Sequence, residues 1–169
     1  MRLYALMVFL HVLAAVVWVG GMFLMHFAVR PVAVAQLPPA QRLPLLAEIL
    51  GRFFSWVTAS VLLVLATGVA MIFGIGAAAG AMAAGKGAFG EGMRLAHGSV
   101  HVMFAIGIAM SLIFAFIRLV PYPRLRSALA AQQLPAAAAS LDHIRRLVAV
   151  NLVLGVLTIA AATLGRAIL

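Results

Sequence analysis

Four long apolar stretches separated by short polar segments dominate the chain. They cover residues 3–29, 53–75, 95–120 and 147–165, and arginines stand at or near most of their ends. A bilayer core about 30 Å thick requires about 20 helical residues to cross it, and each stretch is roughly that long or longer. We therefore predict an all-α fold, an integral membrane bundle of four transmembrane helices that forms one domain, residues 1–169.

The first apolar stretch follows Arg2 and therefore resembles the start of a secretory signal. The apolar core of such a signal is only about 7–15 residues long, whereas residues 3–29 form one extended apolar run. We interpret this run as a membrane span.

The connections between the stretches differ in composition. Residues 31–52 and 121–146 combine prolines with leucine-rich or alanine-rich segments, which predicts short interfacial helices in both. Residues 76–92 are rich in glycine and alanine, which is typical of a loop.

The distribution of cations predicts how the chain is oriented in the membrane. Eight of them lie beside the connections 31–52 and 121–146: Arg30, Arg42, Arg52, Arg118, Arg124, Arg126, Arg145 and Arg146. The other side has Arg2, Lys86, Arg94 and Arg166. Since Lys and Arg are retained on the cytoplasmic side, we expect both connections in the cytoplasm and both termini in the periplasm, in a bacterial inner membrane.

Composition supports the membrane assignment and narrows the chemistry. Hydrophobic residues make up 66% of the chain and charged residues 9%, against about 25% charged in soluble domains; the mean hydropathy is +1.20. The net charge of +9 suits lipid headgroups, so we expect a lipid bilayer and no nucleic acid as partner. The absence of cysteine excludes disulfides, thiolate metal sites and thiol catalysis.

Five histidines are the main candidates for function, because ionisable residues inside a membrane are costly and usually functional. At 1.5 Å per residue, His11 lies about 13 Å below Arg2, and His101 lies about 10 Å below Arg94. His11 and His101 therefore reach nearly the same depth in the first and third spans, and we expect them to bind one cofactor from opposite sides. The remaining three are His97, His26 and His143.

His97 shares a helix face with His101, one turn away, and is expected as a second ligand, a rim partner or a contact for a haem propionate. His26 and His143 lie near the cytoplasmic ends of their spans and are either packing residues or a second site.

Helical spacing places further candidates on the His11 face of the first span: Met7, Trp18, Met22 and Met25, with His26 about 60° away. A face of imidazole, indole and thioether suits the apolar walls and axial ligands of a porphyrin. It equally suits Cu(I), which accepts thioether and imidazole. Polar groups on the other spans are expected to form hydrogen bonds between helices, namely Ser55, Thr58, Thr67, Asn151 and Thr158. Gly155 is expected to permit close helix packing.

The first span carries a motif that resembles a known family. The residues are His11-x6-Trp18-x-Gly20-Gly21-x-x-Leu24, followed by Arg30-Pro31. They resemble the first span of the copper resistance protein D domain family, and are similar to the small four-span membrane protoporphyrinogen oxidases of bacteria. Both groups also have a histidine in the third span, which His101 in His101-Val102-Met103 matches.

The two groups imply different functions. The copper branch implies copper uptake or tolerance at the inner membrane. The oxidase branch implies haem b and oxidation of a porphyrin precursor, with an important lysine two residues after the histidine of the third span. This chain has Met103 at that position, which places the oxidase activity in doubt but leaves the two histidines intact.

These observations lead to three hypotheses. The first is a b-type haem protein with iron held by His11 and His101, and with His97, Trp18 and Met103 near the cofactor. It would act in electron transfer or as a membrane oxidoreductase, with quinone or another redox partner. The second is a copper-binding or copper-transport protein that uses His11 and His101 or the face Met7, Met22, Met25 and His26. The third is a structural or assembly subunit; the sequence also allows a homo-oligomer.

Overall fold

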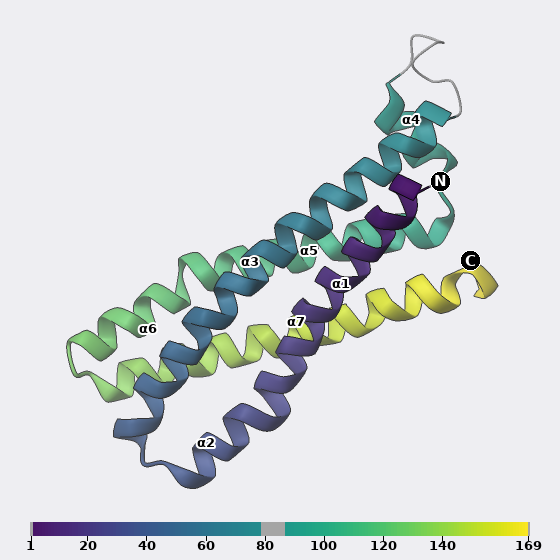
Figure 1. Cartoon of the computed structure of the whole chain (residues 1–169). Coiled ribbons are helices and arrows are strands. Elements are labelled where there is room, and N and C mark those ends of the chain that lie inside the picture. Colours follow the sequence, from purple (N-terminus) through teal and green to yellow (C-terminus); the bar gives the residue numbers. More distant parts are fainter. Residues whose placement is uncertain (1, 79–86, 169) are drawn as a thin grey trace.

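The protein is built from long helices. We describe it from a computed structural model that covers residues 2–78 and 87–168 (Figure 1). The described elements are α1 (Arg2–Leu24), the π-helical segment η1 (Met25–Val29), α2 (Arg30–Gln36), α3 (Pro39–Ala78), α4 (Ala88–Leu95), α5 (Gly98–Leu119), α6 (Pro121–Ala130) and α7 (Leu134–Ile168). No strand occurs within these described ranges.

Four helical segments are long and apolar enough to cross a membrane, which confirms the predicted all-α, four-span architecture. They run over Arg2–Gln36, Pro39–Ile75, Gly98–Ala130 and Leu134–Leu164. Many large apolar side chains on them are exposed, among them Leu112, Val16 and Leu62. A surface of this kind is stable in lipid, where exposed apolar side chains carry no hydration cost.

The connecting segments are more continuous with the spans than the sequence suggested. The helices expected within residues 31–52 and 121–146 are present, but α2 continues the first span, and α3 and α7 each begin before the apolar stretch they contain. The turns in these two connections are therefore short. Within residues 76–92, α4 replaces part of the expected loop, and residues 79–86 lie outside the described residues.

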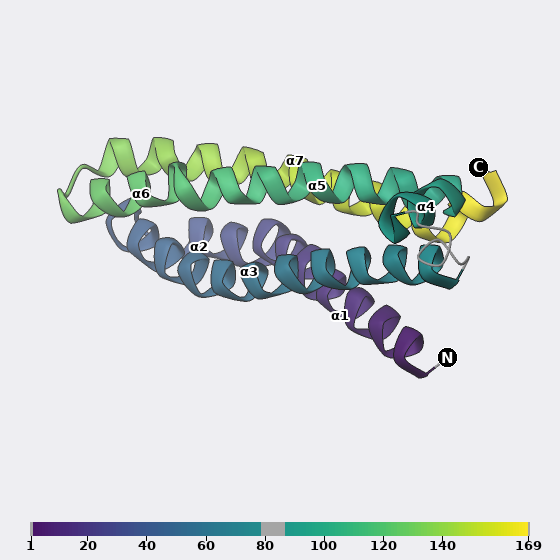
Figure 2. The ribbon, with the colours of Figure 1, turned by 90° about the horizontal axis from the view of Figure 1, so that it is seen from above.

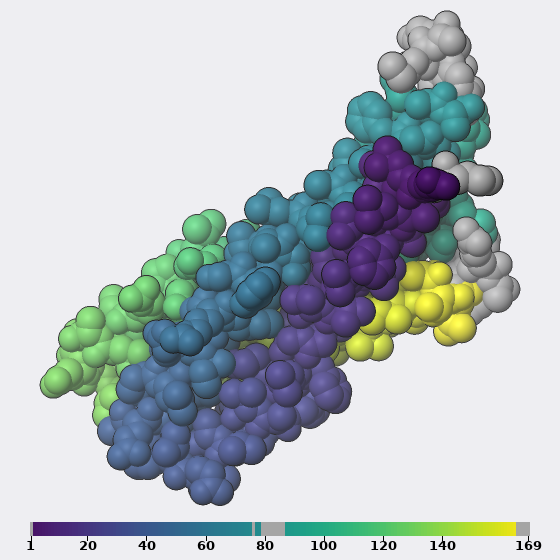
Figure 3. Space-filling view, in the orientation of Figure 1, coloured from purple at the N-terminus to yellow at the C-terminus, as the bar shows by residue number. Residues whose placement is uncertain are grey.

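The helices form two pairs that lie side by side. α1 packs along α3, and α5 packs along α7, while α7 also contacts α1 and α3. The two chain ends and α4 lie at one end of the bundle, the terminal end, and the α2–α3 and α6–α7 turns lie at the other, the turn end (Figure 2). Toward the terminal end, α1 and α7 diverge from each other (Figures 1 and 2). Figure 3 shows α1 lying against α3 on the surface of the molecule.

Aromatic rings fill the core between the two pairs. The ring of Phe54 on α3 packs edge-on against Phe114 of α5, with centroids 5.8 Å apart, and against Tyr122 of α6 at 5.2 Å. Trp18 of α1 packs edge-on against Phe114 at 6.3 Å. Edge-to-face pairs of this kind contribute about 0.5–1.5 kcal/mol beyond their buried area. The pairs are thus joined mainly by a network of rings from four different helices.

A glycine permits a close contact between α1 and α7. A Cβ atom at Gly155 would lie 2.8 Å from Cγ2 of Val19 and 3.3 Å from Cε of Met110. No side chain larger than hydrogen fits at that separation without movement. The expected close packing at Gly155 is therefore confirmed, and small residues at such crossings are typical of membrane bundles.

The predicted hydrogen bonds between helices are confirmed only in part. Thr67 bonds a side chain of another helix, as described below, and the Thr158 hydroxyl lies 3.9 Å from Sδ of Met110. The prediction was wrong for Ser55 and Thr58, whose hydroxyls donate to carbonyls one turn earlier in their own helix, as Ser and Thr in apolar helices commonly do. Oδ1 of Asn151 is buried without a partner among the described residues.

One turn of the first span is wider than an α-helix. In η1 the N–H of Arg30 donates to the carbonyl of Met25, five residues earlier. Pro31 follows directly, and a proline inside a helix lacks an N–H and crowds the carbonyl four residues before it, here that of Phe27. The wider turn relieves this crowding. The helix is not broken, since the flanking residues Leu24 and Arg30 keep right-handed helical dihedrals.

Candidate functional site

His11 lies between α1 and α3 in the terminal half of the bundle. Its Nδ1 is 2.8 Å from Oγ1 of Thr67. The Thr67 hydroxyl has a single hydrogen, which points at the carbonyl of Leu63, 2.6 Å away. Its oxygen is therefore the acceptor toward His11, and the imidazole carries its proton on Nδ1. The lone pair of His11 then resides on Nε2, which is the form in which a neutral histidine binds a metal.

Gly68 provides the space beside the imidazole. A Cβ atom at this position would lie 3.4 Å from Cε1 and 3.9 Å from Nδ1 of His11. The ring thus donates a hydrogen bond to Thr67 and packs against a part of the helix surface that has no side chain. A partner that bonds the second ring nitrogen and fixes the ring orientation is typical of metal-binding histidines.

His101 is exposed on α5, one turn after the start of that helix. Its Nδ1 lies 3.3 Å from the carbonyl oxygen of His97. A carbonyl can only accept, so Nδ1 of His101 carries the proton and Nε2 is available to a ligand. His101 and His11 thus share the same tautomer, each set by an acceptor on Nδ1.

His97 serves as the N-cap of α5. Its Nδ1 accepts from the backbone N–H of Ser99 and lies 3.2 Å from the Ser99 hydroxyl. Because Nδ1 accepts, the proton of a neutral His97 ring is on Nε2, so neither nitrogen has a lone pair free for a metal. The observed role of His97 is structural, and the expectation that it binds a cofactor stays a prediction.

No hydrogen bond joins His11 and His101 among the described residues, and the expectation that they bind one cofactor stays a prediction. α1 packs against α3 and α7, whereas His101 belongs to the other pair, on α5. Within the described ranges, no group of three or more His, Cys, Asp or Glu side chains could hold a metal ion. A metal site within these ranges would therefore have at most two ligands of these residue types.

The predicted His11 face of α1 is turned toward the bundle. Trp18 and Met22 are 3% and 2% exposed, while Met7 and Met25 are half-buried. Trp18 packs against Phe114, which fits the expectation that it contacts a neighbouring helix. On α5, Met103 is half-buried.

Met110 is a buried thioether that the sequence reasoning did not single out. It is 3% exposed and lies beside Gly155 of α7. Its distance of seven residues from Met103, two helical turns, was the only signal available for it.

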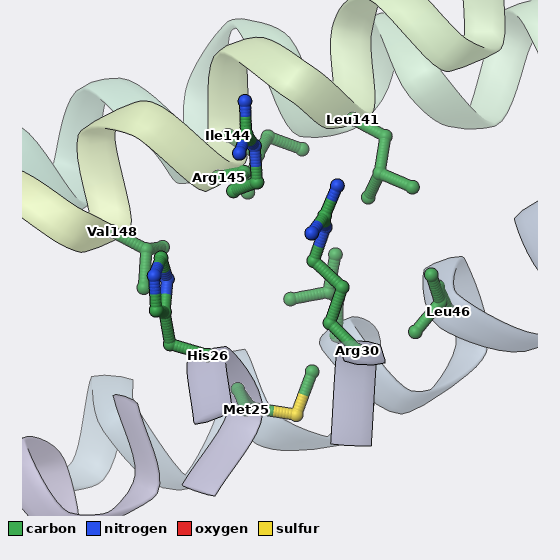
Figure 4. A pocket seen from close by; sticks show the side chains of 9 residues that line it. Met25, His26, Arg30, Leu46, Leu141, Ile144, Arg145 and Val148 are labelled. Atoms are coloured by element: carbon green, nitrogen blue, oxygen red, sulfur yellow. The ribbon is translucent and has the colours of Figure 1, made fainter. Parts of the chain in front are cut away.

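His26 and His143 lie in different surroundings at the turn end. His26 lines a cavity of about 40 Å³ together with Met25, Arg30 and Arg145, and its ring points toward Val148 of α7 (Figure 4). The ring of His143 packs edge-on against Phe116, 6.1 Å away. No hydrogen bond or ring contact joins the two histidines among the described residues, and a shared second site stays a prediction.

An ion pair lies at the terminal end, beyond the apolar spans. Two guanidinium nitrogens of Arg94 bond the carboxylate of Glu91 within α4. The hydrogen bonds and the charge of Glu91 raise the pKa of Arg94 above its ordinary value. The pair stabilises α4 just before the His97 cap.

The fold defines a class: a four-span helical membrane protein, here with a half-buried imidazole that bonds Thr67 inside the bundle. A family model, copper resistance protein D, matches residues 47–164, and the chain belongs to this family. The match confirms the resemblance stated above and extends from α3 into α7, so it includes Thr67, Gly68 and His101 but not His11. No curated protein and no solved structure matches the chain.

Proposed function

We propose that the protein binds Cu(I) within the membrane, with Nε2 of His11 as the principal ligand. The observation that carries this proposal is the hydrogen bond from His11 to Thr67, which leaves Nε2 unprotonated. Cu(I) is the metal that accepts imidazole and thioether without any thiolate. Membership of a family linked to copper resistance supports this metal.

Met7 is the thioether best placed to join His11. It lies four residues earlier on the same face of α1, and residues four apart on a helix are neighbours. Linear, two-coordinate ligation by one nitrogen and one sulfur suits the soft monovalent ion and needs no cluster of three ligands.

A second pair of ligands of the same kind, Met25 and His26, lines the cavity at the turn end. The two pairs are separated by Trp18 and Met22, which are packed in the core. Transfer of Cu(I) from one pair to the other therefore requires movement of these two side chains. We propose binding at both pairs, with copper as the cargo.

Titration of the detergent-purified protein with Cu(I), against a chromophoric competitor, tests the proposal. We expect His11→Ala to abolish the tighter of two binding events, and His26→Ala to abolish the weaker. The matched control is His143→Ala, which should keep both. Unchanged stoichiometry and affinity in His11→Ala would overturn the assignment.

The proposed orientation of the chain in the membrane follows from the cation count. We propose a bacterial inner membrane with both termini in the periplasm, because eight of the twelve Lys and Arg residues flank the turn end. Since the chain has no cysteine, a single Gln133→Cys substitution in the α6–α7 turn gives one labelling site. A membrane-impermeant maleimide should label it only after the cells are opened; labelling of intact cells would reverse the orientation.

Haem b is the second candidate, and one observation favours it. His11 and His101 both have Nδ1 bonded to an acceptor, so both Nε2 atoms suit axial ligation of iron. Haem would supply electron transfer at this position, with quinone or another redox partner. The absorbance spectrum after haem supplementation tests this candidate. A Soret band that is lost in His101→Ala but kept in His97→Ala would favour haem over copper, and the absence of any Soret band would exclude it.

A further inference from the structure

Three arginines from three helices line two adjoining cavities at the turn end. Arg30 of α2 and Arg145 of α7 line the cavity of about 40 Å³, and Arg30 and Arg42 of α3 line its neighbour of about 200 Å³. The two cavities share Arg30, Leu46 and Leu141. Figure 4 shows Arg30 and Arg145 on facing helices, among the side chains that line the smaller cavity. This place is distinct from His11, which lies in the other half of the bundle.

The positive charge there is not balanced by the protein. Among the described residues, Asp142 is the only acid that lines either cavity. Its two carboxylate oxygens already accept from Nε of Arg145 and Nε of Arg146, each at 2.9 Å. Neither Arg30 nor Arg42 forms an ion pair within the described part of the chain.

The excess charge bears directly on Arg30. Its guanidinium is repelled by Arg145 and by Arg42, and is attracted by Asp142. An arginine cannot relieve such repulsion by losing its proton. In a partly buried cavity beside lipid, where charges are weakly screened, a bound anion is the remaining way to compensate for it.

The wide turn η1 is what directs Arg30 into the cavities. Met25 and Arg30 are five residues apart, which in an α-helix would place them about 140° apart. In η1 they are joined by the hydrogen bond from the N–H of Arg30 to the carbonyl of Met25, and both side chains line the same cavity. The wide turn thus brings Met25 and Arg30 to the same side of the first span.

We propose that the adjoining cavities between α2, α3 and α7 bind a phosphate group. Planar guanidinium groups match the paired oxygens of phosphate, which makes arginine the preferred residue for recognising it. The larger cavity has ample room, since a water molecule occupies about 30 Å³. The other lining residues are mainly apolar, namely Val34, Leu43, Leu46, Ala138 and Leu141. Basic pockets with apolar walls at a membrane boundary suit the phosphate of an anionic lipid, and free phosphate shares the same chemistry.

Thermal unfolding of the full, delipidated chain in neutral detergent separates the two sources. The probes are dioctanoyl phosphatidylglycerol, inorganic phosphate and, as a neutral control, dioctanoyl glycerol. We expect phosphatidylglycerol to raise the Tm and dioctanoyl glycerol to leave it unchanged. A matching rise with inorganic phosphate alone would identify free phosphate as a ligand. If neither phosphate-bearing probe changes the Tm, the proposal is overturned.

Substitutions test whether phosphatidylglycerol binds in these two cavities. Arg30→Gln and Arg42→Gln should each weaken phosphatidylglycerol binding by about tenfold or more, the usual loss for one charged hydrogen bond. Arg52→Gln is the matched control. It removes the same charge from α3, but Arg52 is exposed and pairs with Glu48. Equal weakening in Arg52→Gln would contradict the site and indicate attraction by net charge alone. Leu141→Trp fills the cavity without changing any charge, and should also weaken binding. No probe contains a metal, so failure here leaves the copper proposal untouched.

Discussion

Replacement of Thr67 by valine tests the reasoning about His11 most directly. Valine nearly matches the shape of threonine but cannot accept the Nδ1–H, which now lies 2.8 Å from the hydroxyl oxygen. Loss of a partner of this kind typically lowers metal affinity by 10–100-fold, which corresponds to about 1.4–2.7 kcal/mol. We therefore expect Thr67→Val to weaken Cu(I) binding by that factor in a competition titration, with the stoichiometry unchanged.

The same substitution should also lower the free energy of unfolding. Hydrogen bonds between membrane helices contribute about 0.6 kcal/mol on average and rarely more than about 1.7. We expect a loss of about 1 kcal/mol, because His11 is only half-buried. The matched control is Thr163→Val, since the Thr163 hydroxyl bonds only carbonyls of its own helix.

A double-mutant cycle supplies the refutation. In a chain that already carries His11→Ala, Thr67→Val should lower the free energy of unfolding only slightly, because the two substitutions remove one shared interaction. Equal Cu(I) affinity of Thr67→Val and the unmodified chain, measured alongside a clear loss in His11→Ala, would show that the hydrogen bond does not prepare Nε2 for the metal.

Three further substitutions follow from the packing and the helix cap. Gly155→Ala should lower the free energy of unfolding by about 1–3 kcal/mol through overpacking against Val19, whereas Gly107→Ala, with nothing within 4 Å, should be nearly neutral in the same thermal assay. Trp18→Ala should cost about 3–5 kcal/mol in denaturant unfolding, because Trp18 is 3% exposed and joins α1 to Phe114; an unchanged midpoint would contradict its place in the core. His97→Ala should cost about 1 kcal/mol by removing the cap of α5 while Cu(I) binding persists, and His97→Asn should restore the stability; loss of copper in both would identify His97 as a ligand.

The sequence predicted the spans well because the bilayer imposes a length that is read directly from apolar runs. The inward face of α1 was also predictable, since Trp18 and Met22 follow helical spacing from His11 and both are buried. The starts of the long helices were less predictable. Pro44 lies inside α3, and composition alone gives no reason for one helix to continue from Pro39 through the polar segment into the span.

The hydrogen-bond partner of His11 could not be predicted from helical periodicity. Spacing identifies which residues of one helix share a face, but it does not say which helix that face meets. Thr67 was expected to bond another helix, and it does, yet the pairing of α1 with α3 was needed to assign His11 as its partner. The matched depth of His11 and His101 is likewise a property of single helices, whereas their separation depends on how the two pairs pack.

The wide turn at Met25–Val29 also sets the angular relation between the two halves of the first span. If the same residues were wound as a plain α-helix, with none removed, everything before the turn would rotate by about 100° relative to everything after it. If α2 kept Arg30 in the cavities, His11 would leave Thr67; if α1 kept His11 in place, Arg30 would leave the cavities. One additional residue in one turn is therefore what lets a single helix present an imidazole to α3 at one end of the bundle and a guanidinium to α7 at the other.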